Sequence, residues 1–260
     1  MKSAKQIIFG VAAMVVALSM TTRAQTHKKS PAPAATSAKG SIPDLNGVWL
    51  SVKGDSVGAG ADFFHIKTWP TRPWAEQEAI YNQGHEEINP SGGEGIGGTD
   101  SQSEDQVAWK HCAPLGPTAS WQHAASVFEI IQTPEEVIIF HEWDHGIRQV
   151  WMDGRPHPKN VKTTWMGHSI GHYENGDTLV IDTVGINTIT RMDRVHVNTD
   201  AYHLVERIQR TGDVINITIT FDDPKALTAP VTGYHHFHIT NFEVDPEVTC
   251  EDWLVGKSTP

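Results

Sequence analysis

The chain has 260 residues and a formal net charge of −11, from 31 acidic and 20 basic side chains. A field of that sign argues against nucleic acid or an anionic membrane surface as the partner, because both are themselves negatively charged. Nine tryptophans and 15 histidines are many for this length, which points to aromatic contacts and imidazole chemistry.

The first two dozen residues have the layout of a secretory signal peptide. Lys2 and Lys5 precede an almost unbroken apolar run over residues 7–20, and Ala24 offers a small residue for cleavage. The run is shorter than the roughly 20 residues of a membrane-spanning helix, so no stable membrane insertion is expected after cleavage. The sequence therefore predicts a signal peptide over 1–24 and a periplasmic or extracellular protein.

The expected mature chain begins with a polar segment and continues as one domain. Residues 25–40 are rich in Pro, Ala, Ser, Thr and Lys, which predicts a disordered spacer before a single β-barrel domain over 41–260. Loss of the signal peptide leaves 17 basic against 31 acidic side chains, a net charge of −14. The two cysteines of this exported chain, Cys112 and Cys250, predict one disulfide.

Most of the domain has the pattern of short strands. The exception is a helix expected from Thr71, as its N-cap, to about Asn82, with Pro73 in its first turn. The turn at Asn175-Gly176 is the strongest hairpin signal. Strands are expected at 47–50, 128–132, 137–143, 147–152, 165–174, 177–184, 202–209, 214–221, 233–240 and 242–250. The pattern predicts an all-β fold, an antiparallel, up-and-down barrel of about nine to ten strands with one N-terminal helix. A barrel is favoured over a sandwich because closure removes unpaired edges.

Six short motifs punctuate the chain. They read PDLNGVW at 43–49, FEIIQTP at 128–134, DGRPHP at 153–158, WMGHSIG at 165–171, DTLVIDT at 177–183 and DDP at 222–224. By these motifs the chain resembles a large, mostly uncharacterised family of secreted bacterial lipocalin-like proteins, and it departs from their pattern between Asn187 and Asn198. The resemblance implies a lipocalin-like barrel and assigns no activity.

Residues 167–171, GHSIG, match the nucleophile elbow of serine hydrolases. That motif requires a strand before the serine and a helix after it, whereas here the hairpin at Asn175-Gly176 follows at once. Pairing across that turn places Ser169 opposite Asp182, so a strand pair is expected and a serine hydrolase using Ser169 is the least favoured hypothesis. His168 remains a candidate catalytic residue.

The densest run of histidines lies within residues 234–238, YHHFH. Side chains alternate across a strand, so His236 and His238 share a face, and histidines at that spacing can bind one zinc ion with a third ligand from a neighbouring strand. His141 is the candidate third ligand and His203 an alternative. The pattern permits a divalent metal site, zinc favoured, with no other cofactor implied; solvent-facing or hydrogen-bonded histidines are the alternative.

Two carboxylates, Glu206 and Asp182, alternate with aliphatic residues on their strands and are candidate catalytic residues. A carboxylate directed to the core must be paired, because burying it alone is costly. Glu206 either forms a structural pair with a cation such as Arg148 or, partly desolvated, serves as general acid or base. Asp182 presents the same choice.

Aromatic residues at the mouth of a barrel suit planar or sugar-like ligands. Trp143, Trp151 and Tyr234 are the candidate ligand-binding residues, with core and rim packing as the alternative role of the tryptophans.

Together these residues favour an exported enzyme, a metal-assisted hydrolase or lyase acting on a small polar organic molecule such as a sugar derivative or a phenolic. The alternative is a non-catalytic, lipocalin-like carrier of a small molecule. In either case the expected partner is a small-molecule ligand or substrate.

Overall fold

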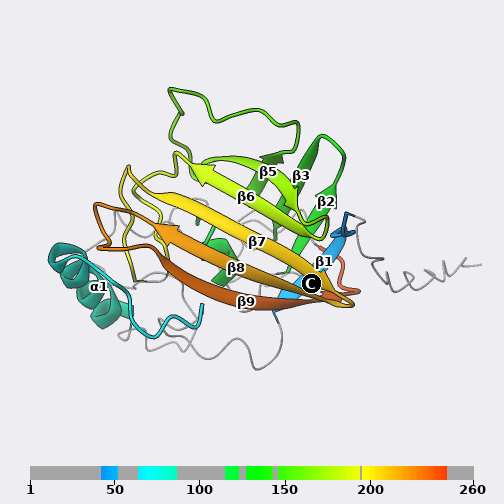
Figure 1. The fold of residues 1–260 in the computed structure, drawn as a ribbon. Coiled ribbons are helices and arrows are strands. Elements are labelled where there is room, and N and C mark those ends of the chain that lie inside the picture. The colour runs from blue at the N-terminus through cyan, green and yellow to red at the C-terminus, as the bar shows by residue number, and fades with distance from the viewer. Residues whose placement is uncertain are drawn as a thin grey trace, which may run out of the picture. The chain divides into compact units, whose positions relative to one another are not determined.

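Nine strands form a closed barrel in the computed structural model of the chain, which describes residues 42–51, 64–86, 115–122, 127–142, 146–193 and 195–244 (Figure 1). The strands are β1 (Gly47–Ser51), β2 (Phe128–Gln132), β3 (Glu136–His141), β4 (Gly146–Trp151), β5 (His168–Glu174), β6 (Thr178–Val184), β7 (His203–Thr211), β8 (Val214–Asp222) and β9 (Val231–Thr240). Each strand pairs with the next along the chain, and β1 closes the barrel on β9. The predicted all-β barrel is confirmed at this level.

The barrel is not antiparallel throughout, which corrects the prediction. β4 and β5 pair in parallel, at Val150 with Ser169 and at Trp151 with Ile170, while the other eight pairs are antiparallel. An odd number of strands cannot close with every pair antiparallel, so a nine-stranded barrel needs at least one parallel pair. A parallel pair requires a crossover connection, and residues 152–167 provide it outside the barrel (Figure 1).

The register of the β5–β6 hairpin differs by one residue from the prediction. A two-residue turn at Asn175-Gly176 would place Ser169 opposite Asp182, but Ser169 lies opposite Thr183. The left-handed φ angles of Asn175 and Gly176, 53° and 76°, fit the expected turn. Asp177 adds a third residue to the connection, and its carboxylate accepts hydrogen bonds from the side chains of Thr178 at 2.8 Å and Gln209 at 3.0 Å.

Large side chains fill the inside of the barrel. Trp121, on the 3-10 helix Ala119–Gln122, is buried among Phe128, Phe237 and His141, with ring centroids 4.7 to 5.5 Å away. The inward faces of the strands add a mostly aliphatic layer: Ile130, Val137, Ile139, Val150, Leu179, Ile181, Leu204, Ile208, Ile215, Ile217, Ile219 and Phe221. The described interior is therefore a packed core.

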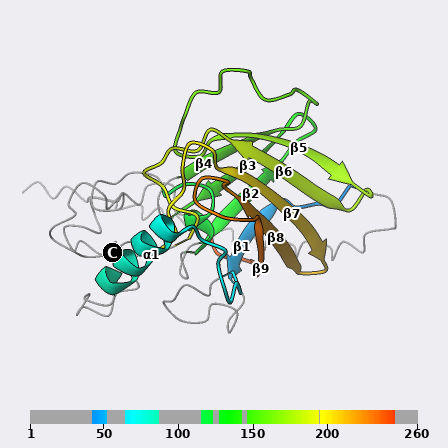
Figure 2. The ribbon, with the colours of Figure 1, turned by 60° about the vertical axis from the view of Figure 1, so that its left-hand side comes forward.

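The one α-helix of the described residues, α1 (Pro73–Glu86), lies beside the barrel (Figure 2). Pro73 lies in its first turn as predicted, but the helix begins one residue later than an N-cap at Thr71 implies and runs one turn further than expected. Thr71 is one residue too early for the N-cap, since the backbone N–H of Glu76 bonds to the carbonyl of Arg72 at 2.9 Å. The Asn82 amide donates to the carbonyl of Val195 at 2.8 Å and ties the helix to the connection between β6 and β7.

Several predictions fall outside the described residues. These are the signal peptide, the spacer, Trp143, Cys112 and Cys250, and the strand expected at 242–250 beyond residue 244. Residues 242–244 are described and form no strand, and β9 ends before them at Thr240. Within the described ranges, no helix is long and apolar enough to cross a membrane.

Candidate functional site

A buried ion pair lies inside the barrel. Arg148 of β4 and Glu206 of β7 are 1% and 0% exposed, and their side chains meet through two hydrogen bonds, one of them 2.9 Å from Nη1 to Oε1. Trp121 donates its indole N–H to the same Oε1 at 2.8 Å. The predicted pairing of Glu206 with Arg148 is confirmed. Glu206 is held as an acceptor for three donors and is not available as a base.

The same guanidinium contacts two buried hydroxyls. Arg148 Nε donates to Ser169 Oγ at 3.2 Å, and Nη2 donates to Thr183 Oγ1 at 2.7 Å. The two hydroxyls are 2.9 Å apart and hydrogen-bond to each other. No helix follows Ser169, because β5 continues into the hairpin. Ser169 therefore lacks the setting of a nucleophile elbow, as the sequence indicated.

Outside the barrel, four side chains from three strands and the crossover connection form a hydrogen-bonded chain. His168 Nδ1 lies 2.8 Å from His157 Nδ1, and His157 Nε2 lies 3.1 Å from Asp182 Oδ1. His203 Nε2 reaches the same Oδ1 at 2.8 Å. His168 is on β5, Asp182 on β6 and His203 on β7, so neighbouring strands place the three on one outer face. We call this set, with His157, the histidine–aspartate chain.

Asp182 is the charged centre of the histidine–aspartate chain. The hydrogen bond from His203, and then that from His157, lowers the pKa of Asp182 below its ordinary value. Asp182 in turn raises the pKa of His203, with a smaller contribution from Asp222. Partial burial, with the nearby His157 and Arg155, lowers the pKa of His168. At neutral pH the chain thus joins an ionised carboxylate to a neutral imidazole at its far end.

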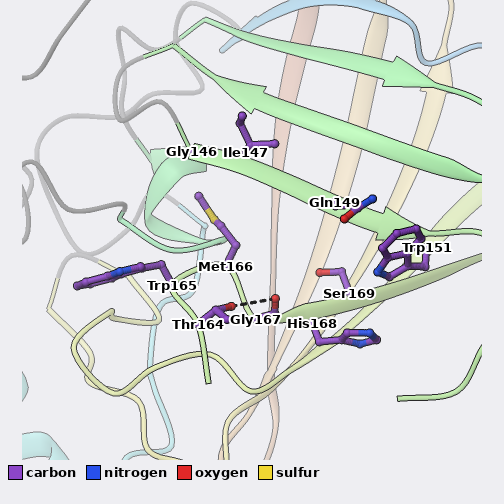
Figure 3. Close-up of a pocket in the computed structure, with 10 residues that line it drawn as sticks. All are labelled: Gly146, Ile147, Gln149, Trp151, Thr164, Trp165, Met166, Gly167, His168 and Ser169. Carbon is purple, nitrogen blue, oxygen red and sulfur yellow. Dashed lines mark hydrogen bonds between the residues drawn. The ribbon is translucent and has the colours of Figure 1, made fainter. Parts of the chain in front are cut away.

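A groove of about 400 Å³ begins where this chain ends. It lies between β4 and the residues leading into β5, at the place where these two parallel strands diverge (Figure 3). It is lined by Gly146, Ile147, Gln149, Trp151, Thr164, Trp165, Met166, Gly167, His168 and Ser169. In Figure 3, His168 and Trp151 lie at one end of the groove and Met166 points toward β4.

Gly167 fixes the entry into β5. Its φ is +69°, a left-handed conformation that side chains with a Cβ rarely adopt. A Cβ there would also lie 2.8 Å from Ile186, Thr183 and the carbonyl oxygen of Val184. The glycine therefore allows the close approach that sets His168 against the outer face of the barrel.

The structure does not bring the predicted metal ligands together. His141 is fully buried on the inward face of β3. His236 and His238 are half-buried on the other face of β9, alternating with the buried His235 and Phe237. The three histidines therefore cannot share one ion, and the described residues contain no group of three or more His, Cys, Asp or Glu arranged to hold a metal.

The histidine–aspartate chain itself fits hydrogen bonding better than metal binding. Two nitrogen ligands of a tetrahedral zinc ion lie roughly 3.3 Å apart. The Nδ1 atoms of His157 and His168 are 2.8 Å apart, which is a hydrogen-bond distance. His203, the alternative third ligand in the prediction, bonds to Asp182.

The remaining predicted residues divide between groove and surface. The expectation that Asp182 faces the core is wrong: its neighbours Ile181 and Thr183 point inward, so Asp182 points outward. Trp151 lines the groove, and the Arg155 guanidinium lies 3.8 Å over its ring. Tyr234 is 46% exposed and stacks on His65 at 4.4 Å, away from the residues that line the groove.

His157 is the site residue that sequence reasoning missed. It lies in the crossover connection, where no strand or helix periodicity indicates the direction of a side chain. Its place in the DGRPHP motif was the available signal. Arg155, paired with Asp153 through several hydrogen bonds and stacked over Trp151, orders the same connection two residues earlier.

No protein-family model, no curated protein and no solved structure matches the chain. The class of protein is therefore defined by its own geometry. It is a closed, mixed nine-stranded β-barrel with the histidine–aspartate chain beside an external groove. A barrel fold supports many activities, so only this site indicates a function.

The Asp182–His203 pair predicts a pH dependence of stability. Because the pKa of Asp182 is lowered in the folded state, Asp182 contributes to the free energy of unfolding above pH 3.8. This contribution is lost as the pH falls through the folded pKa. Because the pKa of His203 is raised in the folded state, His203 contributes to the free energy of unfolding below pH 6.5. This contribution is lost as the pH rises through the folded pKa. We expect Asp182→Asn to lower the melting temperature most between pH 3.8 and pH 6.5.

The measurement is the melting temperature of the parent and of Asp182→Asn across that range. Glu174→Gln is the control, because Glu174 pairs with His172 at 3.5 Å on the same outer face and both are exposed. A difference between the parent and Asp182→Asn that stays constant from pH 3 to pH 9 would contradict the prediction.

Proposed function

We propose that the protein is an acid–base enzyme acting on a small organic molecule held in the groove, with His168 as the general base. The order of hydrogen bonds in the histidine–aspartate chain carries the proposal. Asp182 accepts a hydrogen bond from His157 Nε2, which leaves His157 Nδ1 to accept a hydrogen bond from His168 Nδ1. This leaves the lone pair of His168 Nε2 for a substrate in the groove.

The electrostatics support the same role. A base that works near neutral pH must be largely unprotonated there, and a lowered pKa keeps the His168 imidazole neutral. Asp182 stabilises the positive charge that arises when His168 takes a proton, through His157. A carboxylate that orients an imidazole in this way is the arrangement used by base-assisted nucleophile sites in unrelated folds.

The volume and lining of the groove suit a small substrate with a planar or apolar part. Its volume lies within the range of small-molecule sites, which combine apolar walls with a few polar groups. Trp151, Ile147 and Met166 supply the walls. The base would remove a proton from water that attacks a carbonyl carbon, giving hydrolysis, or from the carbon next to a carbonyl while a leaving group departs from the following carbon with its electron pair, giving elimination.

This proposal keeps the expected hydrolase or lyase chemistry and does without a zinc ion, because the predicted ligands lie on opposite faces. It also keeps export to the periplasm or the exterior as an expectation. The alternative of a carrier with its ligand inside the barrel has less support, since Trp121 and the aromatic rings around it fill the described interior.

The test is hydrolysis of 4-nitrophenyl acetate, a planar ester small enough for the groove, measured from pH 5 to pH 9. We expect turnover above the buffer rate that rises with pH through a pKa below 6.5 and then levels off, as His168 loses its proton. A rate equal to that of buffer across the range would overturn the proposal. So would a rate that does not rise with pH through a pKa below 6.5.

A further inference from the structure

The buried hydroxyls of Ser169 and Thr183 have one proton more than their hydrogen bonds to each other and to Arg148 use. Arg148 donates to both oxygens, so neither hydroxyl can give its own proton to the guanidinium. One of the two hydroxyl protons forms the Ser169–Thr183 hydrogen bond. No further acceptor for the second is found among the described residues, and an unsatisfied buried donor is costly.

Of the two residues, only Ser169 lines a space where an acceptor can bind. Thr183 is fully buried, whereas Ser169, 1% exposed, is among the residues that line the groove (Figure 3). When Thr183 donates to Ser169, the Ser169 proton is directed away from Thr183 and Arg148. A ligand oxygen in the groove is then the acceptor that completes the network.

We propose that Ser169 donates a hydrogen bond to a carbonyl oxygen of the substrate, so that the groove takes carbonyl compounds with a planar or apolar body. This rests on the proposed function and names its substrate class. Because Ser169 Oγ accepts a charge-assisted hydrogen bond from Arg148, its own O–H is polarised and becomes a stronger donor. Such a donor suits the negative charge that a carbonyl oxygen gains when a neighbouring base acts.

Ser169 acts in this scheme as a donor and forms no bond to carbon. A serine nucleophile needs a base in contact with its hydroxyl. The adjacent His168 points to the outer face of β5, whereas Ser169 points inward to Arg148 and Thr183. The two residues therefore approach the groove from opposite faces of one strand, one as base and one as donor.

The experiment compares two ligands with the same ring, 4-hydroxyacetophenone and 4-ethylphenol, of which only the first carries a carbonyl. We expect the full-length protein to bind the ketone at least about tenfold more tightly by calorimetry, the difference that one hydrogen bond of about 1.4 kcal/mol gives. Ser169→Ala should abolish this preference. Ser51→Ala, which removes a buried hydroxyl of β1 that does not line the groove, should keep it.

Equal affinity for the two ligands in the parent, absence of binding by both, or a preference that survives in Ser169→Ala would each overturn the inference. Because the readout is a ratio of affinities, a folded fraction reduced by the substitution does not change it. Ester hydrolysis that depends on His168 together with equal ligand affinities would leave the proposed function standing and remove only the role of Ser169.

Discussion

We expect Glu206→Ala to reduce the free energy of unfolding by about 3 to 5 kcal/mol. The carboxylate accepts hydrogen bonds from Arg148 and from Trp121, and all three residues are at most 1% exposed. Its removal leaves the guanidinium charged and uncompensated in a packed interior.

Urea denaturation at pH 7 measures the loss, with Glu129→Ala on the outer face of β2 as the control. A double substitution, Arg148→Met with Glu206→Leu, tests the cause. We expect it to recover most of the stability, since a buried ion pair replaced by apolar side chains of similar volume is often neutral or stabilising. A loss below about 1 kcal/mol in Glu206→Ala would contradict the prediction.

The sequence predicted the pairing of Glu206 because β7 has a clean alternation. Leu204, Glu206 and Ile208 share a face, two of the three are strongly apolar, and a charge among them requires a partner. The strands themselves were predicted for the same local reasons, alternation and turn residues. The parallel β4–β5 pair was not, because no local signal gives strand direction; it follows only when nine strands are required to close.

The outward direction of Asp182 was missed for a different reason. Flanking valines at 180 and 184 suggested an inward carboxylate, and a two-residue turn agreed with that register. The third turn residue, Asp177, is fixed by Gln209 on β7, a tertiary contact that no hairpin rule contains. With Thr183 opposite Ser169, Asp182 and His168 point outward together.

Three members of the histidine–aspartate chain could therefore be identified from the sequence. His168, Asp182 and His203 were each singled out, in separate roles, and adjacent outward positions on β5, β6 and β7 join them. His157 was not accessible in this way, since its position depends on the path of the crossover between two parallel strands. The groove likewise exists because those two strands diverge.

We expect His168→Gln to lower the turnover of 4-nitrophenyl acetate by about 10²- to 10⁴-fold, the range that general bases contribute. Glutamine keeps a polar side chain of similar reach and can still bond to His157, but its amide takes no proton. His172→Gln is the matched control, because His172 lies four residues further along the outer face of β5 and its side chain is 63% exposed. Turnover of His168→Gln within threefold of the parent, or an equal loss in His172→Gln, would remove His168 as the base.

His157→Gln separates a positioning role from a merely structural one. The positive charge that His157 gains when it binds a second proton lowers the pKa of His168, so its removal should move the rising limb of the pH–rate profile to higher pH. Burial and Arg155 still act on His168, so the limb should remain and turnover should fall less than in His168→Gln. A structural role alone would lower turnover through the folded fraction and leave the limb in place. The shift of that limb therefore shows whether His157 acts on the base directly.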